Sequence, residues 1–301
     1  MSAPLFRWVV AASLPLERLL AAQGLSNALG EGRVFVDGKR SASDFELASG
    51  AVVEVFAPRP RAAIEILSET DDVFAVHKPA ALPTEPDRQG ADCVLQQLGQ
   101  LLRVEPEGLF AVSRLDVGVS GVLLVTLGSR SRERLLGERA AGGLLRRYVA
   151  LAAGVPAPAE GEWRDALGKA KGGKRVVGGR EPQLSHSRYR VVARASAALP
   201  DGEPTALLAL SPVTGRTHQL RVHAAAHGAP LLGDRKYGGP ARMTAPDGSV
   251  QAFSQILLHA AWVEWGAAGQ RRRITSEPVA ALVDAWLALG GELTAIQRAL
   301  D

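Results

Sequence analysis

Hydrophobic residues follow two different spacings in the first part of the chain. Leucines recur at helical spacing between residues 16 and 25, whereas the apolar stretches 33–36 and 52–56 are typical of short strands. Pro58 and Pro60 then interrupt regular secondary structure, as expected for a linker. We therefore predict a small module over residues 1–58, a linker over 59–63 and a larger domain over 64–301.

Short apolar segments that predict strands dominate the rest of the chain. Helical spacing is confined to residues 94–102, to a short segment rich in arginine and glutamate after Ser129, and to residues 278–287. Because the predicted strands outnumber the helices and do not alternate with them, a doubly wound parallel sheet is disfavoured and we predict an α+β fold. The predicted strands are residues 73–76, 122–125, 148–151, 189–192, 207–210 and 257–263.

The composition excludes several classes of protein. With 47% hydrophobic and 22% charged residues among 301, the chain is globular rather than disordered or fibrous. Its single cysteine, Cys93, excludes an internal disulfide framework and a cysteine-rich zinc site. No apolar run reaches the length of about 18 residues that a membrane span requires, and residues 8–16 lead into a helical pattern without a signal-peptide cleavage site. We expect a cytoplasmic protein that does not contact a membrane.

Basic residues are concentrated in one part of the chain. The net charge of +4 is compatible with a polyanionic partner, and residues 144–190 alone carry ten basic and four acidic residues, a net charge of +6. Within that stretch, residues 169–179 combine glycines with Lys171, Lys174 and Arg175, as in a loop that contacts phosphates. A solvated surface loop explains the same charges equally well, so the composition leaves both interpretations open.

The densest polar pattern surrounds Asp116. Residues 113–121 form a glycine-containing turn between two apolar segments, so that Asp116 can face a cleft while strands hold its backbone. Arg114 lies two positions away and shares the same face in an extended segment. On this pattern alone, a turn aspartate bound to local backbone amides is the simpler explanation.

A second polar pattern follows a Thr-Gly turn in residues 211–223. It contains His218 and His223, and His227 comes four residues later, at the spacing of two metal ligands on one face of a helix. However, neither an H-E-x-x-H pattern nor an acidic ligand at a matching spacing accompanies these histidines. Capping and hydrogen bonding are therefore favoured, and a metal hydrolase that uses the three histidines is kept as an alternative.

Two shorter patterns are unspecific on their own. Residues 77–86 contain three prolines, two of which flank a short apolar segment. This pattern predicts a rigid loop directly after Lys78. Arg146 and Arg147 precede Tyr148 at the start of a predicted strand. Neither pattern identifies a chemistry without the others.

In order along the chain, these four patterns resemble the RluA-type family of RNA pseudouridine synthases. The similarity covers roughly residues 64–280. It implies a mixed, mostly antiparallel central sheet with helices and loops around a basic cleft, and the isomerisation of uridine to pseudouridine within RNA. The family motifs N-K-P-x-G-L-P, H-R-L-D-x-x-T-S-G, K/R-x-Y-x-A, G-R-T-H-Q-I-R-V-H and G-D-x-x-Y-G correspond to residues 77–83, 113–121, 146–150, 215–223 and 233–238.

The resemblance also implies roles for individual residues. Asp116 would be the catalytic carboxylate, which either attacks covalently or removes a sugar proton, and Arg221 would pair with it and keep it ionised. Tyr148 would stack on the uracil and help remove the C5 proton, and Arg114 would fill the space left by the flipped base. Neither a metal nor an organic cofactor is implied. The remaining implied or predicted RNA contacts are Lys78, Arg147, Arg216, His218, Lys171, Lys174 and Arg175.

Two departures from the family pattern leave a non-catalytic RNA-binding protein on the same scaffold as the alternative. Ser113 and Val119 stand where the family has histidine and threonine. The joint presence of Asp116, Tyr148 and Arg221 favours the enzyme. We expect ribosomal or transfer RNA as the partner, no obligate protein partner, and a monomer.

The leading part of the chain is similar to an S4-type RNA-binding module, a small α/β unit. The likeness covers residues 15–57 and rests on the turn and strand at 25–39 and the last strand at 50–55. Residues 1–58 carry five basic and six acidic residues, however, and the helix expected after Ser26 has no arginine. We therefore expect little autonomous RNA binding by this module, and its presence favours ribosomal RNA only by analogy.

Overall fold

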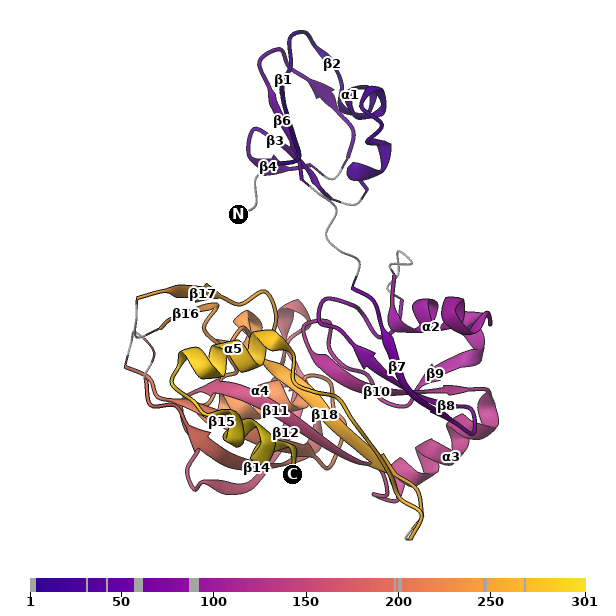
Figure 1. The fold of residues 1–301 in the computed structure, drawn as a ribbon, viewed down its shortest axis with the longest axis vertical. Coiled ribbons are helices and arrows are strands. Elements are labelled where there is room, and N and C mark those ends of the chain that lie inside the picture. Colours follow the sequence, from indigo (N-terminus) through magenta and orange to yellow (C-terminus); the bar gives the residue numbers. More distant parts are fainter. Residues whose placement is uncertain are drawn as a thin grey trace. The chain divides into compact units, whose positions relative to one another are not determined.

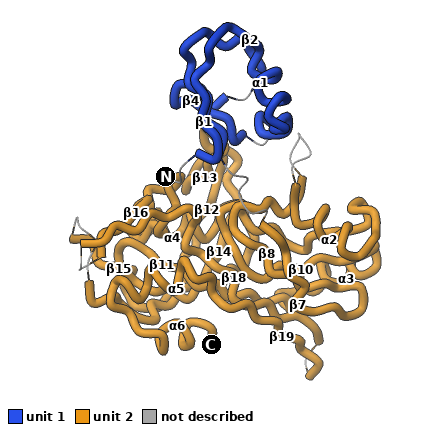
Figure 2. The backbone as a smooth tube through the Cα atoms, turned by 45° about the horizontal axis from the view of Figure 1, so that its top comes forward, with its two compact units in different colours: residues 1–61 blue, residues 62–301 orange. Residues whose placement is uncertain are grey.

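The computed structural model describes residues 4–301 except residues 31, 42, 57–61, 87–91, 198, 200–201, 246–247 and 268. The chain divides into two units, residues 1–61 and residues 62–301 (Figure 2). Residues 59–61 of the predicted linker lie outside the described residues, and residues 62 and 63 precede the first strand of the second unit. Each unit has a hydrophobic core of its own.

The first unit is a four-stranded antiparallel sheet with one α-helix. Leu16 and Leu20 of the helix are fully buried in the core of this unit. Asp37 and Gly38 have φ values of 49° and 74°, so this Asp-Gly pair forms the tight turn that its sequence predicts. In sheet order the strands are β1 (Phe6–Val9), β6 (Val52–Val55), β3 (Val34–Val36) and β4 (Lys39–Arg40); the other elements are α1 (Leu16–Ala22), η1 (Ser26–Ala28), β2 (Leu14–Pro15) and β5 (Glu46–Leu47).

The second unit is built on one large mixed sheet, which confirms the predicted α+β fold (Figure 1). The strand order is β13-β12-β14-β15-β11-β18-β10-β8-β7, with β9 paired to β10 and β19 to β18. Among these pairings only that of β10 with β18 is parallel. The strands are β7 (Glu65–Thr70), β8 (Val73–Lys78), β9 (Leu109–Ala111), β10 (Ser120–Leu127), β11 (Leu145–Ala153), β12 (Glu160–Lys169), β13 (Arg175–Val177), β14 (Arg180–Arg194), β15 (Thr205–Pro212), β18 (Leu258–Trp265) and β19 (Arg272–Thr275).

Helices pack at both ends of this sheet. Helix α2 contacts β9, and α3 contacts β10. Helix α6 packs on β11, β14 and β15, and α5 contacts both α6 and β11. Helix α4 contacts the strands β12 to β15. The helices are α2 (Val94–Leu102), α3 (Ser129–Ala140), α4 (Gln219–Ala226), α5 (Ala280–Ala288) and α6 (Leu293–Leu300), with short 3-10 turns η2 (Pro106–Gly108), η3 (Lys171–Gly173) and η4 (Arg235–Tyr237) and a small ladder of β16 (Arg242–Thr244) and β17 (Val250–Ala252).

Side-chain alternation along the central strands produces two cores, one on each face of the sheet. On β11, Val149 and Leu151 belong to the cluster that contains Trp286 of α5. Tyr148 and Ala150 belong to the other cluster, because successive side chains of a strand point to opposite faces. Both faces are buried, so the strand has a continuous apolar sequence instead of an alternating one. Tyr148 therefore lies on the face opposite the cluster that contains α5.

Gly121 gives a test of this packing. It lies where β10 pairs with β18; its φ is +116°, and a Cβ would lie 2.2 Å from the carbonyl oxygen of Ala260. We predict that Gly121→Ala lowers the free energy of unfolding by about 3 kcal/mol, because neither the backbone angle nor the space admits a side chain. Urea unfolding measures the loss.

The matched control is Gly137→Ala in the exposed part of α3, where open space surrounds the new Cβ. There the same change should raise the free energy of unfolding by up to about 1 kcal/mol, because alanine is the better helix former. A similar effect of both substitutions would contradict the packing described for Gly121.

Candidate active site

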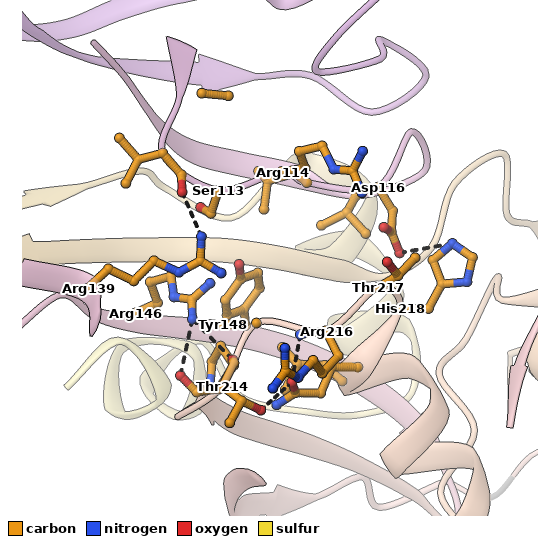
Figure 3. Close-up of a pocket in the computed structure, with 18 of the residues that line it drawn as sticks. Ser113, Arg114, Asp116, Arg139, Arg146, Tyr148, Thr214, Arg216, Thr217 and His218 are labelled. Atoms are coloured by element: carbon orange, nitrogen blue, oxygen red, sulfur yellow. Dashed lines mark hydrogen bonds and ion pairs between the residues drawn. The ribbon is translucent and has the colours of Figure 1, made fainter. Parts of the chain in front are cut away.

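A cavity of about 370 Å³ opens in the second unit (Figure 3). Its walls come from the loop before β10, from α3, from the start of β11 and from the segment that leads into α4. Six of the lining side chains are arginines. The lining also includes two carboxylates, those of Glu85 and Asp116. The volume lies in the usual range for small-ligand sites. The cavity is therefore strongly cationic and large enough for one nucleotide-sized group.

The backbone around Asp116 is fixed by hydrogen bonds to two other segments and by one bond within the turn. Thr84 Oγ1 donates to the carbonyl oxygen of Leu115 at 2.9 Å and accepts the Leu115 N–H at 3.2 Å. The carbonyl oxygen of Gly118 accepts the Ile256 N–H at 3.1 Å, and the Val119 N–H closes the turn on the carbonyl oxygen of Asp116 at 3.0 Å. The Asp116 side chain is one-quarter exposed. A rigid turn thus presents a carboxylate at the cavity surface.

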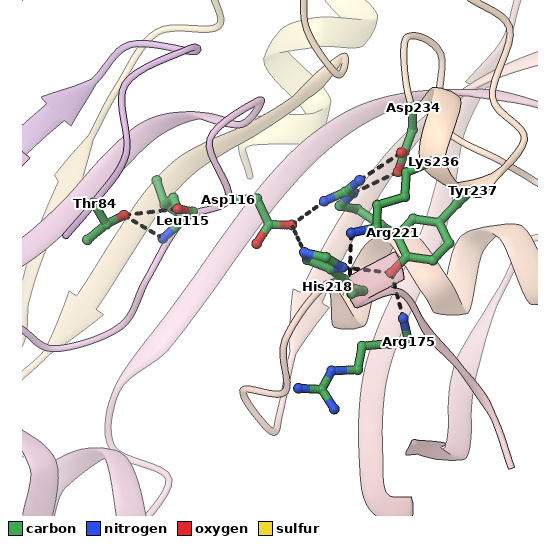
Figure 4. A network of polar contacts seen from close by, with 10 residues as sticks. Thr84, Leu115, Asp116, Arg175, His218, Arg221, Asp234, Lys236 and Tyr237 are labelled. Atoms are coloured by element: carbon green, nitrogen blue, oxygen red, sulfur yellow. Dashed lines mark hydrogen bonds and ion pairs between the residues drawn. The ribbon is translucent and has the colours of Figure 1, made fainter. Parts of the chain in front are cut away.

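Arg221 joins Asp116 to a second, buried carboxylate (Figure 4). Its Nη1 donates to Asp116 Oδ2 at 2.7 Å, while Nε and Nη2 donate to the two oxygens of Asp234 at 2.7 and 2.8 Å. Burial alone would lower the pKa of Arg221, but the hydrogen bonds and charges of Asp234 and Asp116 raise it above its ordinary value. Arg221 is therefore a permanent cation that the bidentate contact with Asp234 holds in one orientation.

Tyr148 lines the cavity from β11, and Arg146 lies two residues before it on the same side. Arg146 Nη2 donates to the carbonyl oxygens of Pro212 and Thr214 at 3.4 and 3.2 Å. Burial raises the pKa of Tyr148, so its phenol is neutral at physiological pH even though Arg146 acts in the opposite direction. The pair presents an aromatic ring next to a fixed guanidinium group.

Arg147, which we predicted as an RNA contact, lies outside this cavity. Its guanidinium carbon is 5.6 Å from the centre of the Trp262 ring, and its Nη2 donates to the carbonyl oxygen of Asp301 at 3.5 Å. Adjacent strand residues point to opposite faces, so only one of two consecutive arginines can share the face of Tyr148. Arg146 replaces Arg147 as the residue of this motif that faces the cavity.

Lys78 is also placed differently from our prediction. Its side chain is fully buried, and Nζ donates to the carbonyl oxygens of Pro79, Leu82 and Val117 at 2.9, 2.7 and 3.4 Å. Burial lowers the pKa of this amine to about 7, while the charge of Asp116 acts to raise it. Lys78 thus ties the proline-rich loop to the residue that follows Asp116 and does not reach the cavity.

Two arginines of α3 face the cavity, and the sequence patterns did not identify them. Arg132 and Arg139 are seven residues apart and therefore lie on one side of the helix. Arg139 Nη1 donates to the carbonyl oxygen of Val112 at 2.8 Å, and burial together with the nearby Arg146 lowers its pKa. The only available signal was the arginine-rich composition of the helix, which solvent exposure explains equally well.

The cavity arginines lack carboxylate partners in most cases. Among the described residues, no ion pair is formed by Arg132, Arg139, Arg146 or Arg216, whereas Arg114 makes a long contact of 3.4 Å with Glu85. Arg216 instead donates from Nε to the carbonyl oxygen of Leu184 at 3.2 Å. Several positive charges therefore converge without local compensation, as in a site for a polyanion.

The predicted basic loop is held next to α4 but does not line the cavity. Tyr237 Oη accepts the Arg175 N–H at 3.0 Å, and Lys236 Nζ donates to the carbonyl oxygen of Gly173 at 2.9 Å. Lys171 and Lys174 are exposed. The loop thus adds charge outside the cavity through side chains that are free to contact a large ligand.

His223 and His227 lie next to an acidic side chain from another element. No acidic residue stands at a ligand spacing from these histidines in the sequence, but Asp165 of β12 accepts a hydrogen bond from His227 Nε2 at 2.8 Å and lies 3.8 Å from His223 Nε2. Strand β12 is distant in sequence from α4 but packs against it. Within the ranges given above, no group of three or more His, Cys, Asp or Glu side chains is arranged to hold a metal ion.

Among the residues that the structure describes, no helix is long and apolar enough to cross a membrane.

Comparison with known proteins gives consistent matches. Residues 72–226 match the family model described as RNA pseudouridylate synthase. The dual-specificity RNA pseudouridine synthase RluA of Escherichia coli (strain K12) is 32% identical over 219 residues, which cover 69% of this chain and 89% of that protein. An uncharacterized RNA pseudouridine synthase of Synechocystis is 30% identical over 235 residues, which cover 72% of this chain and 74% of the relative.

Solved structures share the fold. The human RNA pseudouridylate synthase domain containing 1 superposes with a TM-score of 0.59 and 22% identity, over 81% of this chain and 97% of that one. The human domain containing 4 gives a TM-score of 0.58 and 22% identity, over 76% of this chain and 94% of that one. At this identity the likeness concerns the fold alone.

Lys78 gives a pH-dependent test of the site. Because its pKa is near 7 in the folded chain and 10.5 in a free side chain, the unfolded state binds more protons between these values. We predict that the stability contributed by Lys78 rises with pH across this window, by at most about 1.4 kcal/mol per pH unit. Urea unfolding between pH 7 and 9 should therefore show a loss on Lys78→Met that grows with pH.

Lys171→Met, at an exposed position, is the control, and its effect should not vary over the same range. A constant difference between the wild type and Lys78→Met would show that Lys78 stays protonated in the folded state and would refute this prediction.

Proposed function

The chain belongs to the RluA-type family of RNA pseudouridine synthases, and from this premise we propose that it isomerises specific uridines of structured RNA with Asp116 as the catalytic carboxylate. Family membership makes it an isomerase that acts on RNA and sets aside the non-catalytic alternative. The observation that carries the proposal is the position of Asp116, which is paired on one oxygen with Arg221 and faces a cavity lined by arginines.

The reaction requires a nucleophile or base next to the sugar of the target nucleotide. The bond between C1′ and N1 breaks, the uracil turns, a bond forms between C1′ and C5, and the proton on C5 leaves while N1 gains one, so no electrons are gained or lost overall. Asp116 Oδ2 is bound to Arg221, which leaves Oδ1 for the sugar. Both covalent attack at C1′ and removal of a sugar proton are compatible with this arrangement.

Tyr148 suits a stacking role under the uracil. Its ring forms part of the cavity lining, and its hydroxyl is neutral because burial raises its pKa. A protonated phenol can take up the C5 proton only by passing its own proton on at the same time. We therefore propose stacking as the main contribution of Tyr148 and a proton relay as its contribution to the last step.

The target base has to leave its stack to reach Asp116, at a cost of a few kcal/mol that is smallest in loops. We propose that the phosphates on either side of the flipped nucleotide bind those cavity arginines that form no ion pair with a described carboxylate. Arg114 is exposed at the cavity mouth and would take the place of the flipped base. The residues of this proposal are Arg114, Arg132, Arg139, Arg146, Arg216 and, on the loop outside the cavity, Lys171, Lys174 and Arg175.

The RNA target and the role of the first unit rest on the sequence alone. We propose ribosomal RNA ahead of transfer RNA, a cytoplasmic location and action as a monomer without an obligate protein partner. The S4-like identity of residues 1–58 is part of the same proposal, and their acidic balance supports only a weak contribution to RNA binding.

The central test is pseudouridine mapping of ribosomal and transfer RNA. We predict that cells without the protein lose pseudouridine at one or more positions, that the wild-type chain restores it, and that Asp116→Asn does not. A loss of at least about 10⁴-fold in rate is expected, because the amide cannot act as nucleophile or base. RNA binding by Asp116→Asn should be retained.

Asp165→Asn is the matched control, since Asp165 lies outside the cavity lining and should leave the modification intact. An active Asp116→Asn enzyme would exclude Asp116 as the catalytic group. Unchanged mapping in cells without the protein would remove the proposed targets.

Arg146 and Arg147 provide a test within one strand. We predict that Arg146→Gln lowers kcat/KM by about 10–100-fold, the value of a charged hydrogen bond to a phosphate. Arg147→Gln, on the opposite face, should stay within about twofold of the wild type. Steady-state kinetics on an RNA that carries the mapped uridine gives both values, and a larger effect at Arg147 would overturn the assignment of faces.

A further inference from the structure

A chain of hydrogen bonds leads from the basic loop to the side of Asp116 (Figure 4). The Arg175 N–H donates to Tyr237 Oη at 3.0 Å, and Tyr237 Oη lies 2.6 Å from His218 Nδ1. The other ring nitrogen, His218 Nε2, lies 3.9 Å from Asp116 Oδ2. Four residues from distant parts of the sequence are thus linked in one line.

The direction of these bonds determines which nitrogen of His218 carries the proton. Tyr237 Oη already accepts the backbone N–H of Arg175, so its own proton is available to His218 Nδ1. With Tyr237 as the donor, His218 Nδ1 accepts, and the neutral ring then carries its proton on Nε2. That N–H points toward the space beside Asp116.

His218 stays neutral in this environment. Burial lowers the pKa of His218, and the positive charges of Arg221 and Lys236 lower it further. The negative charge of Asp116 and, more weakly, that of Asp234 act to raise this pKa. A neutral ring supplies a hydrogen-bond donor without adding a second cation to the one that already binds Asp116. The pairing of Arg221 with Asp116 is therefore undisturbed by its neighbour.

The orientation of His218 is also fixed by its backbone. The residue precedes α4 with φ 58° and ψ 18°, a left-handed conformation that is uncommon for residues other than glycine. Its ring makes an edge contact with that of Tyr237, with centroids 5.6 Å apart. The guanidinium carbon of Arg221 lies 4.9 Å from the centre of the same tyrosine ring. Backbone and tyrosine together hold the imidazole in one position.

The gap between His218 Nε2 and Asp116 Oδ2 selects one kind of ligand group. At 3.9 Å the two atoms are too far apart for a direct hydrogen bond. A group that bridges them has to accept a hydrogen bond from Nε2–H and donate one to the carboxylate. A carbonyl oxygen only accepts, whereas a hydroxyl does both. In an RNA chain the free sugar hydroxyl is the one on C2′, next to the C1′ at which the reaction takes place.

We propose that His218 and Asp116 together bind the 2′-hydroxyl of the target nucleotide, and that Tyr237 is the positioning residue that keeps the His218 Nε2–H directed at it. The inference rests on the proposed role of Asp116. It makes His218 the residue through which the enzyme distinguishes a ribose from a deoxyribose at the position that it modifies.

The test compares two oligonucleotides that differ only in the target sugar. One carries the mapped uridine and the other carries 2′-deoxyuridine at the same position. The wild type should prefer the ribose substrate by about 10–100-fold in kcat/KM, the loss expected for one hydrogen bond in a desolvated site. The intrinsic difference in reactivity between the two sugars cancels when this ratio is compared between variants.

The ratio should respond to the donor at position 218. His218→Leu, which has no donor, should lower the preference for ribose by about tenfold, and His218→Gln, which keeps an N–H donor, should restore part of it. Tyr237→Phe should lower the preference by a smaller factor. The imidazole of His218 keeps its place in this variant, but its proton can move from Nε2 to Nδ1. Tyr189→Phe is the matched control, since that hydroxyl donates to the carbonyl oxygen of Pro158 and not to the site.

Long-range ¹H–¹⁵N spectra give a second readout that does not depend on activity. The chain has six histidines, and the signals that His218→Gln removes identify His218. The wild type should show a neutral ring protonated on Nε2, and Tyr237→Phe should shift this signal toward the Nδ1–H form. A wild-type ring protonated on Nδ1 would overturn the proposal.

The kinetic outcomes separate this inference from the proposed function. A wild type that does not discriminate between the sugars, or a His218→Leu variant that keeps the full ratio, refutes the 2′-hydroxyl contact while Asp116→Asn stays inactive on both substrates. Activity of Asp116→Asn on either substrate refutes the proposed function itself.

Discussion

The site depends on one guanidinium group shared by two carboxylates. Asp234 is almost fully buried and binds Arg221 through both of its oxygens, so that one N–H remains directed at Asp116. This geometry holds the Asp116 carboxylate at the cavity surface in one orientation, because the guanidinium group cannot turn away from it. Removal of Asp234 would leave the buried positive charge of Arg221 with one carboxylate partner in place of two. The residue that sets the electrostatics of the site is therefore one that never reaches the cavity.

The turn that carries Asp116 is held from the opposite side by the loop that follows Lys78. Lysine, threonine and backbone N–H groups of neighbouring segments bind carbonyl oxygens of this turn, so these acceptors are satisfied within the protein. The parallel contact of β10 with β18 begins directly after it, at Ser120 and Gly121. A carboxylate placed on such a turn keeps its position relative to Tyr148, which comes from another strand of the same sheet.

The order of the motifs made the family and the fold class predictable. Asp116, Tyr148 and Arg221 each lie within a recognisable pattern, and the structure places all three at one cavity. The direction of side chains was not predictable from those patterns. Arg146 and Arg147 are equivalent in the sequence, but the strand directs them to opposite faces. The motif that contains Lys78 predicted a ligand contact, whereas three carbonyl oxygens hold this amine inside the protein. Arg139 could not be found at all, because its place at the cavity follows from the packing of α3 against β10, a contact between segments without a motif.

The arginines of the cavity have one further consequence, which concerns entropy. Arg139, Arg146 and Arg216 each donate to main-chain carbonyl oxygens of the surrounding loops. A free arginine side chain loses up to about 2 kcal/mol of rotamer freedom when a ligand immobilises it. Here much of that freedom is already lost when the chain folds. Association with a nucleic acid therefore starts from side chains that are already ordered, and less of the binding free energy is spent on arranging them.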